Sequence, residues 1–256
     1  MDKYEKLKEI IKNSRNLVCF TGAGISVPSG IPDFRSANGL YNQKTATNIP
    51  PEVIISHSFY KERPLDFFDF YKTKMCYPKA EPNEAHKYFA NLEKQNKSVV
   101  VVTQNIDGLH QMAGSSKVRE LHGSIMRNYC ARCGKFYSLI ELESSLNNGI
   151  PKCNCGGIIK PDVVLYEEPL DDRVVNNAIN EIRMADTLIV AGTSLVVYPA
   201  AGFIRYFRGK NLIVINLGKL DNLDDACLYI DGRVEDYLNT ENYVSVLFHS
   251  QLTHSL

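Results

Sequence analysis

Short apolar runs recur along the whole chain, each bounded by turn residues. A run that is apolar on both alternate faces is typical of a strand buried in a parallel sheet, with helices covering both sides. We therefore expect strands at 17–20, 99–102, 163–166, 188–190, 212–215 and 244–248.

Apolar residues at helical spacing precede three of these runs. The three sets are Tyr4, Leu7 and Ile11; Ala85, Tyr88, Phe89 and Leu92; and Ile179, Ile182 and Ala185. Alternation of strands with helices is the pattern of a doubly wound sheet. The fold class predicted here is α/β, with a Rossmann-like parallel sheet.

The cysteines form a cluster with the spacing of a metal site. The chain has seven cysteines, an odd number, in 256 residues, which is unlike the disulfide framework of a small secreted domain. Four of them follow C-x2-C-x19-C-x-C, namely Cys130, Cys133, Cys153 and Cys155. Four thiolates satisfy a tetrahedral zinc ion and leave no position open for water, so we expect one structural zinc ion per chain. Free thiols are the alternative, and the other three cysteines are expected to be buried apolar side chains.

Two segments interrupt the strand–helix rhythm. Residues 36–79 have few β-like runs and several aromatic residues, and residues 126–159 hold the cysteine cluster. We predict that these segments form a smaller inserted domain, made of a helical module (36–79) and a zinc-binding module (126–159). The Rossmann-like domain then comprises 1–35, 80–125 and 160–256.

Composition narrows the class of protein. With 29 Lys+Arg and 29 Asp+Glu the formal net charge is zero, which gives no support to nucleic-acid binding or to a polybasic membrane surface. No apolar run approaches the roughly 20 residues of a membrane-spanning helix, and the charged N-terminus does not resemble a signal peptide. We expect a globular protein located in the cytoplasm.

Glycine and polar motifs follow the first two expected strands. Gly22-Ala23-Gly24-Ile25-Ser26 suits a turn against a pyrophosphate, although Val27 stands where G-x-G-x-x-G has its third glycine. Asn216 is the candidate partner of a ribose. More specific are three further motifs: Gly30-Ile31-Pro32-Asp33-Phe34-Arg35, Thr103-Gln104-Asn105-Ile106-Asp107-Gly108-Leu109-His110, and Leu121-His122-Gly123.

With these motifs the chain closely resembles the sirtuin family of NAD-dependent protein deacylases, as a minimal, prokaryote-like member. The resemblance extends from Leu17 to about Val234. It includes, in the family's order, Gly192-Thr193-Ser194-Leu195, Val197-Tyr198-Pro199-Ala200 and Asn216-Leu217-Gly218.

The resemblance implies an NAD-dependent protein lysine deacetylase. In the implied reaction the acyl oxygen of a modified lysine attacks C1′ of the nicotinamide ribose, nicotinamide leaves, and an alkylimidate remains. His122 then activates the ribose hydroxyl that attacks the imidate, and the products are free lysine, nicotinamide and O-acetyl-ADP-ribose. An imidazole suits a base that works near neutral pH. The other five histidines are expected to be structural: His57, His86, His110, His249 and His254.

The resemblance also assigns the NAD contacts. Asn105 would orient the ribose and an ordered water, and Asp107 with the backbone of Ile106 would hold the nicotinamide carboxamide. Phe34 would shield the reacting carbon from water, although core packing is an alternative role for it. The remaining expected contacts are Ala23, Arg35, Gln104, Thr193, Ser194, Asn216, Leu217 and Val234.

An acylated peptide is expected between the two domains, where its backbone could add a strand along Val163–Glu167 and Leu195–Tyr198. Family members that remove acidic acyl groups carry Tyr-x-x-Arg, and the matching stretch here has Tyr71 and Lys74. Because lysine lacks the two-point fork of arginine, we expect uncharged acyl groups to be preferred.

Two other functions are compatible with parts of this pattern. One is an ADP-ribosyltransferase or NAD glycohydrolase, which cleaves the same glycosidic bond without acyl-lysine. The other is a non-catalytic NAD-sensing module, which needs no base. The set of Gln104, Asn105, Ile106, Asp107 and His122 favours the deacetylase.

Overall fold

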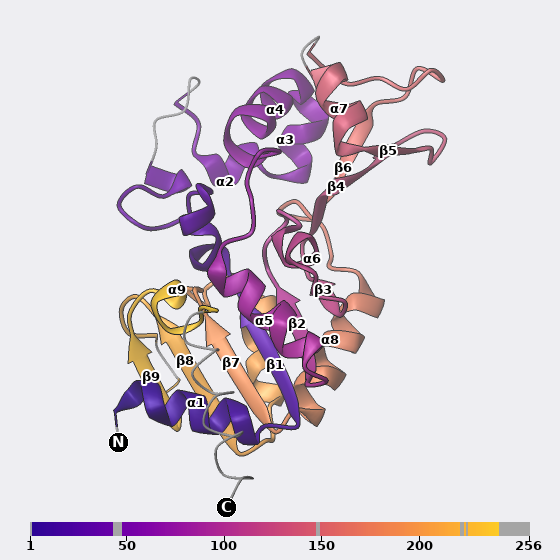
Figure 1. The fold of residues 1–256 in the computed structure, drawn as a ribbon. Helices are drawn as coiled ribbons and strands as arrows, with labels where there is room; N and C mark the ends of the chain where they lie inside the picture. The colour runs from indigo at the N-terminus through magenta and orange to yellow at the C-terminus, as the bar shows by residue number, and fades with distance from the viewer. Residues whose placement is uncertain (1, 43–47, 147–148, 221–222, 224, 241–256) are drawn as a thin grey trace, which may run out of the picture.

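The computed structural model describes residues 2–42, 48–146, 149–220, 223 and 225–240. Within them, six parallel strands form one sheet in the order β3-β2-β1-β7-β8-β9 (Figure 1). The strands are β1 Asn16–Thr21, β2 Ser98–Thr103, β3 Val118–Glu120, β7 Thr187–Ala191, β8 Asn211–Asn216 and β9 Leu228–Asp231. The chain runs outward from β1 to β3 and returns beside β1 at β7, so the strand order reverses between β1 and β7. Ligands of open α/β sheets bind at such a switch point, at the carboxyl ends of the strands.

Helices cover both faces of this sheet, as continuous apolar strands require. Leu17 and Cys19 of β1 pack in one core with α1 and α5, whereas Val18 and Phe20 pack in a second core with α8. The elements over the first face include α1 Lys3–Asn13, α5 Glu84–Lys94 and α9 Val234–Tyr237; those over the second include α8 Asp172–Met184 and η4 Ala200–Tyr206. α6 Leu109–Ala113 packs beside α5.

A second unit lies at the carboxyl end of the sheet, in the upper part of Figure 1. Its antiparallel sheet has the order β5-β4-β6. The strands are β4 Gly123–Cys130, β5 Phe136–Ser138 and β6 Ile159–Val163; the helical elements are α2 Pro51–Ile54, α3 His57–Glu62, α4 Pro64–Phe70, η3 Tyr71–Met75 and α7 Leu139–Leu146. One core joins Phe67 of the 36–79 segment to Leu142 and Ile159, and it also takes in Ile125 and Leu165. This shared core supports one unit made of 36–79 and 126–159, but the exact domain boundaries stay a prediction, since Ile125 and Leu165 of the core lie outside those ranges.

Four of the six expected strands are confirmed, as β1, β2, β7 and β8. The expectation for 163–166 is wrong: Val163 ends β6 in the antiparallel sheet, and Tyr166 forms only an isolated bridge with Ser56. The run at 244–248 lies outside the described residues.

Two strands, β3 and β9, were not predicted from the sequence, and they are the two outer strands of the parallel sheet. An outer strand has a single hydrogen-bonded neighbour and needs less apolar surface, so its pattern is weak. All three residues of β3 are only partly buried. The three expected helices are present as α1, α5 and α8, with Ala185 just beyond the end of α8. No helix in the described part of the chain is both long and apolar enough to span a membrane.

Candidate functional site

A cavity of about 960 Å³ lies at the carboxyl edge of the parallel sheet and extends to the second unit. The segments that follow β1, β2, β7 and β8 line it, together with Val163–Glu168 and parts of the 36–79 segment. Every residue predicted to contact NAD lines this one cavity: Ala23, Phe34, Arg35, Gln104, Asn105, Ile106, Asp107, His122, Thr193, Ser194, Asn216, Leu217 and Val234. The topology therefore brings together residues that are far apart in the sequence.

The glycine loop after β1 continues as η1 Ala23–Ser29 and packs against the loop after β7. Gly24 N donates to Gly192 O at 2.8 Å, and a Cβ on Gly24 would lie 2.8 Å from that oxygen. A side chain here would separate the ends of β1 and β7. The glycine motif predicts only the approach of a pyrophosphate at Gly24, whereas the structure also requires this glycine for packing.

Ser26 connects the glycine loop to the segment after β2. Its Oγ donates to Asp107 Oδ2 at 2.7 Å and accepts from Asn105 Nδ2 at 3.1 Å. Asn105 Nδ2 also donates to Gly22 O at 3.1 Å, so both amide hydrogens are used and only Oδ1 is available to a ligand. The motifs in the sequence predict no role for Ser26. No local pattern in the sequence could have found it, because its partners Asn105 and Asp107 lie about 80 residues further along the chain.

Asp107 is held at both oxygens. Besides the Ser26 bond, Oδ1 accepts from Leu109 N at 2.9 Å. Burial nevertheless raises the pKa of this carboxyl above its usual range, with the two hydrogen bonds acting in the opposite direction. The result is an acceptor of fixed orientation at the wall of the cavity.

His122 stands in the two-residue connection between β3 and β4. Its Nδ1 lies 2.9 Å from Gln104 O, and its own carbonyl accepts from Val164 N at 3.0 Å. Burial lowers the pKa of the imidazole, and the bond to Gln104 O partly opposes this effect. The next residue, Gly123, has φ +75° and would carry a Cβ only 1.9 Å from Asp162 O, so the connection requires glycine.

Gln104 also fixes the loop that follows β7. Its Nε2 donates to Thr193 Oγ1 at 2.9 Å, and this hydroxyl accepts from Leu195 N at 3.2 Å. A hydrogen bond between two cavity-lining residues thereby connects the segment after β2 to the segment after β7.

Phe34 and Arg35 belong to a loop that Asp33 shapes, since Asp33 Oδ1 accepts from the backbone N–H groups of Arg35 and Ser36 at 2.9 and 2.7 Å. The Phe34 ring packs edge to face against the Tyr41 ring, with the ring centroids 5.4 Å apart. The Arg35 guanidinium lies 5.1 Å from the centroid of the Tyr41 ring. Phe34 also packs against the core of the second unit. Packing and a place in the cavity wall are therefore both observed for Phe34.

Three cavity residues lie at or just after the carboxyl ends of β8 and β9. Asn216 ends β8, and its Nδ2 donates to Leu217 O at 2.9 Å, which leaves Oδ1 for a hydroxyl donor. Leu217 is 68% exposed, and Val234 opens α9. The predicted ribose partner thus sits at the carboxyl end of its strand.

Tyr71 and Lys74 are separated by the structure. Tyr71 is fully buried and stacks on Phe67 at 6.2 Å with an interplanar angle of 17°. Lys74 lines the cavity, and Tyr71 is not among its described lining residues.

His57, His86 and His110 are not among the described residues that line the cavity. His86 and His110 are buried side by side, with ring centroids 4.7 Å apart, and desolvation lowers the pKa of His86 to about 4. His57 Nδ1 lies 2.8 Å from Glu168 Oε1. His249 and His254 lie outside the described residues.

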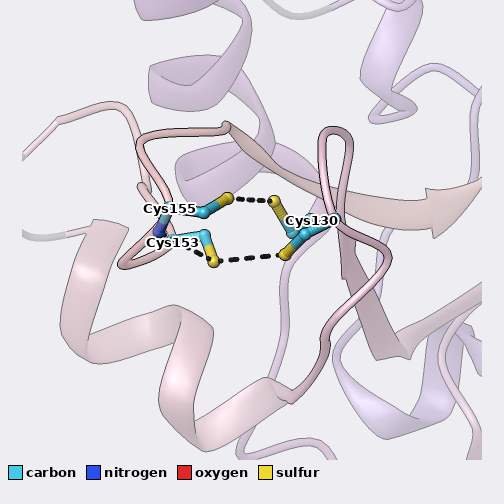
Figure 2. A group of neighbouring side chains, drawn as sticks. Cys130, Cys153 and Cys155 are labelled. Atoms are coloured by element: carbon cyan, nitrogen blue, oxygen red, sulfur yellow. Dashed lines mark hydrogen bonds between the residues drawn. The ribbon is translucent and has the colours of Figure 1, made fainter.

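The four clustered cysteines meet at one point, and Cys130, Cys153 and Cys155 are seen converging in Figure 2. Each contributes a sulfur, and the four sulfurs lie within 4.8 Å of one another. The Cys130–Cys155 and Cys133–Cys153 sulfur pairs are 3.5 and 3.7 Å apart. Zn–S bonds of about 2.3 Å in a tetrahedron require S–S distances of about 3.8 Å. The donor set and its spacing fit one structural zinc ion, as the sequence predicts.

Known proteins resemble this chain over almost its entire length. The model of the Sir2 family matches residues 22–199. An NAD-dependent protein deacetylase from Clostridium perfringens is 62% identical over 236 residues, which cover 91% of this chain and 96% of the relative. One from Staphylococcus aureus is 44% identical over 227 residues, covering 88% and 92%.

Solved structures are also similar to this chain over almost its entire length. A Sir2 variant with a deacetylated p53 peptide and 3′-O-acetyl-ADP-ribose has a TM-score of 0.85 at 36% identity, covering 96% of this chain and 98% of that one. Sir2 with a p53 peptide and NAD⁺ has a TM-score of 0.81 at 37% identity, covering 96% and 100%.

Proposed function

This chain belongs to the Sir2 family and is an NAD-dependent protein lysine deacetylase, and we propose that His122 is its general base, with Asn105 and Asp107 orienting NAD. NAD supplies ADP-ribose as the acceptor of the acyl group and releases nicotinamide. The observation that carries the assignment is the convergence of these side chains and Val163–Glu167 on one cavity.

The hydrogen bonds define what each residue offers. Gln104 O can only accept, so Nδ1 of neutral His122 carries the hydrogen and Nε2 has the free lone pair. Nε2 is therefore the atom that would take a proton from a ribose hydroxyl. Asn105 offers Oδ1, an acceptor suited to a ribose hydroxyl or a water, and Asp107 offers a carboxylate to the amide hydrogens of nicotinamide.

The acyl-lysine peptide would lie along Val163–Glu167 and Leu195–Tyr198. All of the first segment lines the cavity, as do Val197 and Tyr198 of the second. Tyr166 is anchored from behind, because its N–H donates to Ile55 O and its carbonyl accepts from His57 N, each at 3.0 Å. These two hydrogen bonds fix the position of the protein segment along which the substrate peptide would lie.

Incubation of the protein with NAD and an acetyl-lysine peptide tests the function, with mass spectrometry of all products. We expect deacetylated peptide, nicotinamide and O-acetyl-ADP-ribose in equal amounts, and no reaction if either substrate is omitted. Nicotinamide release without peptide would favour a glycohydrolase, ADP-ribosylated protein a transferase, and NAD binding without products a sensing module. A cytoplasmic location and the absence of nucleic-acid binding stay predictions.

A further inference from the structure

Arg127 bridges the two units of the structure. Its Nη1 donates to Glu120 Oε2 at 2.6 Å, and its Nε donates to Asp162 Oδ2 at 2.8 Å. Glu120 ends β3 of the parallel sheet, whereas Arg127 and Asp162 belong to β4 and β6 of the antiparallel sheet. One guanidinium therefore joins the two sheets.

The backbone of β4 directs Arg127 to this position. Ser124 pairs with Asp162 and Asn128 with Pro161, so Ile125 to Arg127 are extra residues relative to β6. Such an irregularity bends a strand and redirects its side chains. Regular pairing would give Arg127 a partner on β6 and a different direction.

Each carboxylate is connected to His122 through a short stretch of backbone. Glu120 is two residues before His122, and Leu121 N donates to Thr103 O at 2.9 Å. Asp162 is two residues before Val164, whose N–H donates to His122 O at 3.0 Å. Holding Glu120 and Asp162 together thus fixes His122 relative to the segment that begins at Val163.

The chemistry of the bridge favours arginine specifically. The Glu120 side chain is only 9% exposed, and a buried carboxylate needs a charged partner. A planar guanidinium can donate to two carboxylates at once in fixed directions, which an ammonium group cannot do with the same geometry. Burial is the largest single influence on the pKa of Arg127 and acts to lower it, but the two carboxylates together raise this pKa above its usual value.

We propose that Arg127 is a positioning residue, which sets the placement of His122 against the substrate segment by clamping Glu120 to Asp162. The effect that we expect on kcat rests on the proposed function, whereas the effect that we expect on the structure around His122 does not.

Arg127→Gln and Arg127→Lys test the clamp by steady-state kinetics. Because a misplacement of about 1 Å can cost about 100-fold in rate, we expect kcat to fall at least about tenfold in both variants. The KM for NAD should change less than about twofold, since Glu120, Arg127 and Asp162 are not among the described residues that line the cavity. The control is Arg119→Gln, which removes an ion pair of 3.1 Å with Glu181 inside the parallel-sheet domain. Full kcat in Arg127→Lys, or in Arg127→Gln, overturns the proposal.

A second variant separates positioning from simple charge balance. Arg127→Gln leaves Glu120 buried without its partner, so the melting temperature should fall. Adding Glu120→Gln removes that charge and should restore the melting temperature, but not kcat. Recovery of kcat together with stability would mean that Arg127 only neutralises Glu120.

Hydrogen exchange tests the clamp without any assay of activity. In Arg127→Gln the amides of Leu121 and Val164 should exchange faster than in the unmodified protein, and in Arg119→Gln they should not. If the unmodified protein fails to deacetylate, the proposed function fails while this measurement still decides on the clamp. Unchanged exchange at both amides would contradict it.

Discussion

The phenol oxygens of Tyr41 and Tyr166, which both line the cavity, lie 2.8 Å apart. Tyr41 packs against Phe34, and Tyr166 belongs to Val163–Glu167, the segment along which the substrate peptide is proposed to lie. A single hydrogen bond therefore connects the cofactor loop with the substrate segment.

Tyr41→Phe removes this hydrogen bond and should raise the KM for both NAD and peptide. Without the bond, binding of one substrate would no longer help to order the segment that binds the other. A hydrogen bond contributes about 0.5–1.5 kcal/mol, or about 2- to 10-fold in affinity. Tyr166→Phe should have the same effect, and the double variant should be no worse than either single one. Additive losses in the double variant would show that the two hydroxyls act independently.

His122→Ala should preserve folding and NAD binding and lower kcat by about 10²–10⁴-fold, the usual contribution of a general base. Calorimetric titration with NAD and steady-state kinetics measure the two effects. Undiminished turnover would remove His122 from the mechanism.

The pH profile of the unmodified protein should reflect the same imidazole. Burial lowers its pKa, so the neutral, basic form persists to lower pH than in a free histidine of pKa about 6.5. The acidic limb of kcat/KM, which reports the pKa values of the free enzyme, should therefore lie below about pH 6.5. A limb clearly above that value would contradict the burial effect on His122.

Asp107→Asn should weaken NAD use and nicotinamide inhibition together, because one carboxylate is proposed to hold the carboxamide in both complexes. Loss of a charged acceptor costs about 1.5–3 kcal/mol, or roughly 10- to 150-fold in affinity. Inhibition curves for nicotinamide at several NAD concentrations measure this. Unchanged nicotinamide inhibition would exclude the assignment.

Metal analysis of purified protein should find about one zinc ion per chain, bound by four thiolates. Cys130→Ala should release the metal and lower the melting temperature, because structural zinc supplies part of the folding free energy. Cys227→Ala is the control, since Cys227 lies outside the cluster. Equal metal content in the two variants would refute the zinc site.

Acetyl-lysine should be preferred over succinyl-lysine in kcat/KM. Tyr71 packs in the core of the second unit, so only Lys74 of the pair reaches the cavity, and lysine holds a carboxylate without a two-point fork. Kinetics on one peptide in both acylated forms decide this. A clear succinyl preference that is lost in Lys74→Ala would reverse the interpretation.

The sequence by itself determined the elements whose signal is local. The central strands β1, β2, β7 and β8 are buried on both faces, so their apolar runs are continuous and visible. The cysteine spacing and the order of the motifs are also local, and they identified the family and the residues that line the cavity.

Only the tertiary structure decided features that depend on distant partners. Val163 looks like a strand of the large sheet in sequence, but its pairing with Gly123 places it in the antiparallel sheet. β3 and β9 were missed because an outer strand needs little apolar surface. Ser26, Tyr41 and Arg127 carry no local signal, since their roles come from Asp107, Tyr166 and Glu120, which approach only when the chain folds. Local periodicity reports how much of a segment is buried, whereas hydrogen-bond partners are set by the packing of segments far apart in the chain.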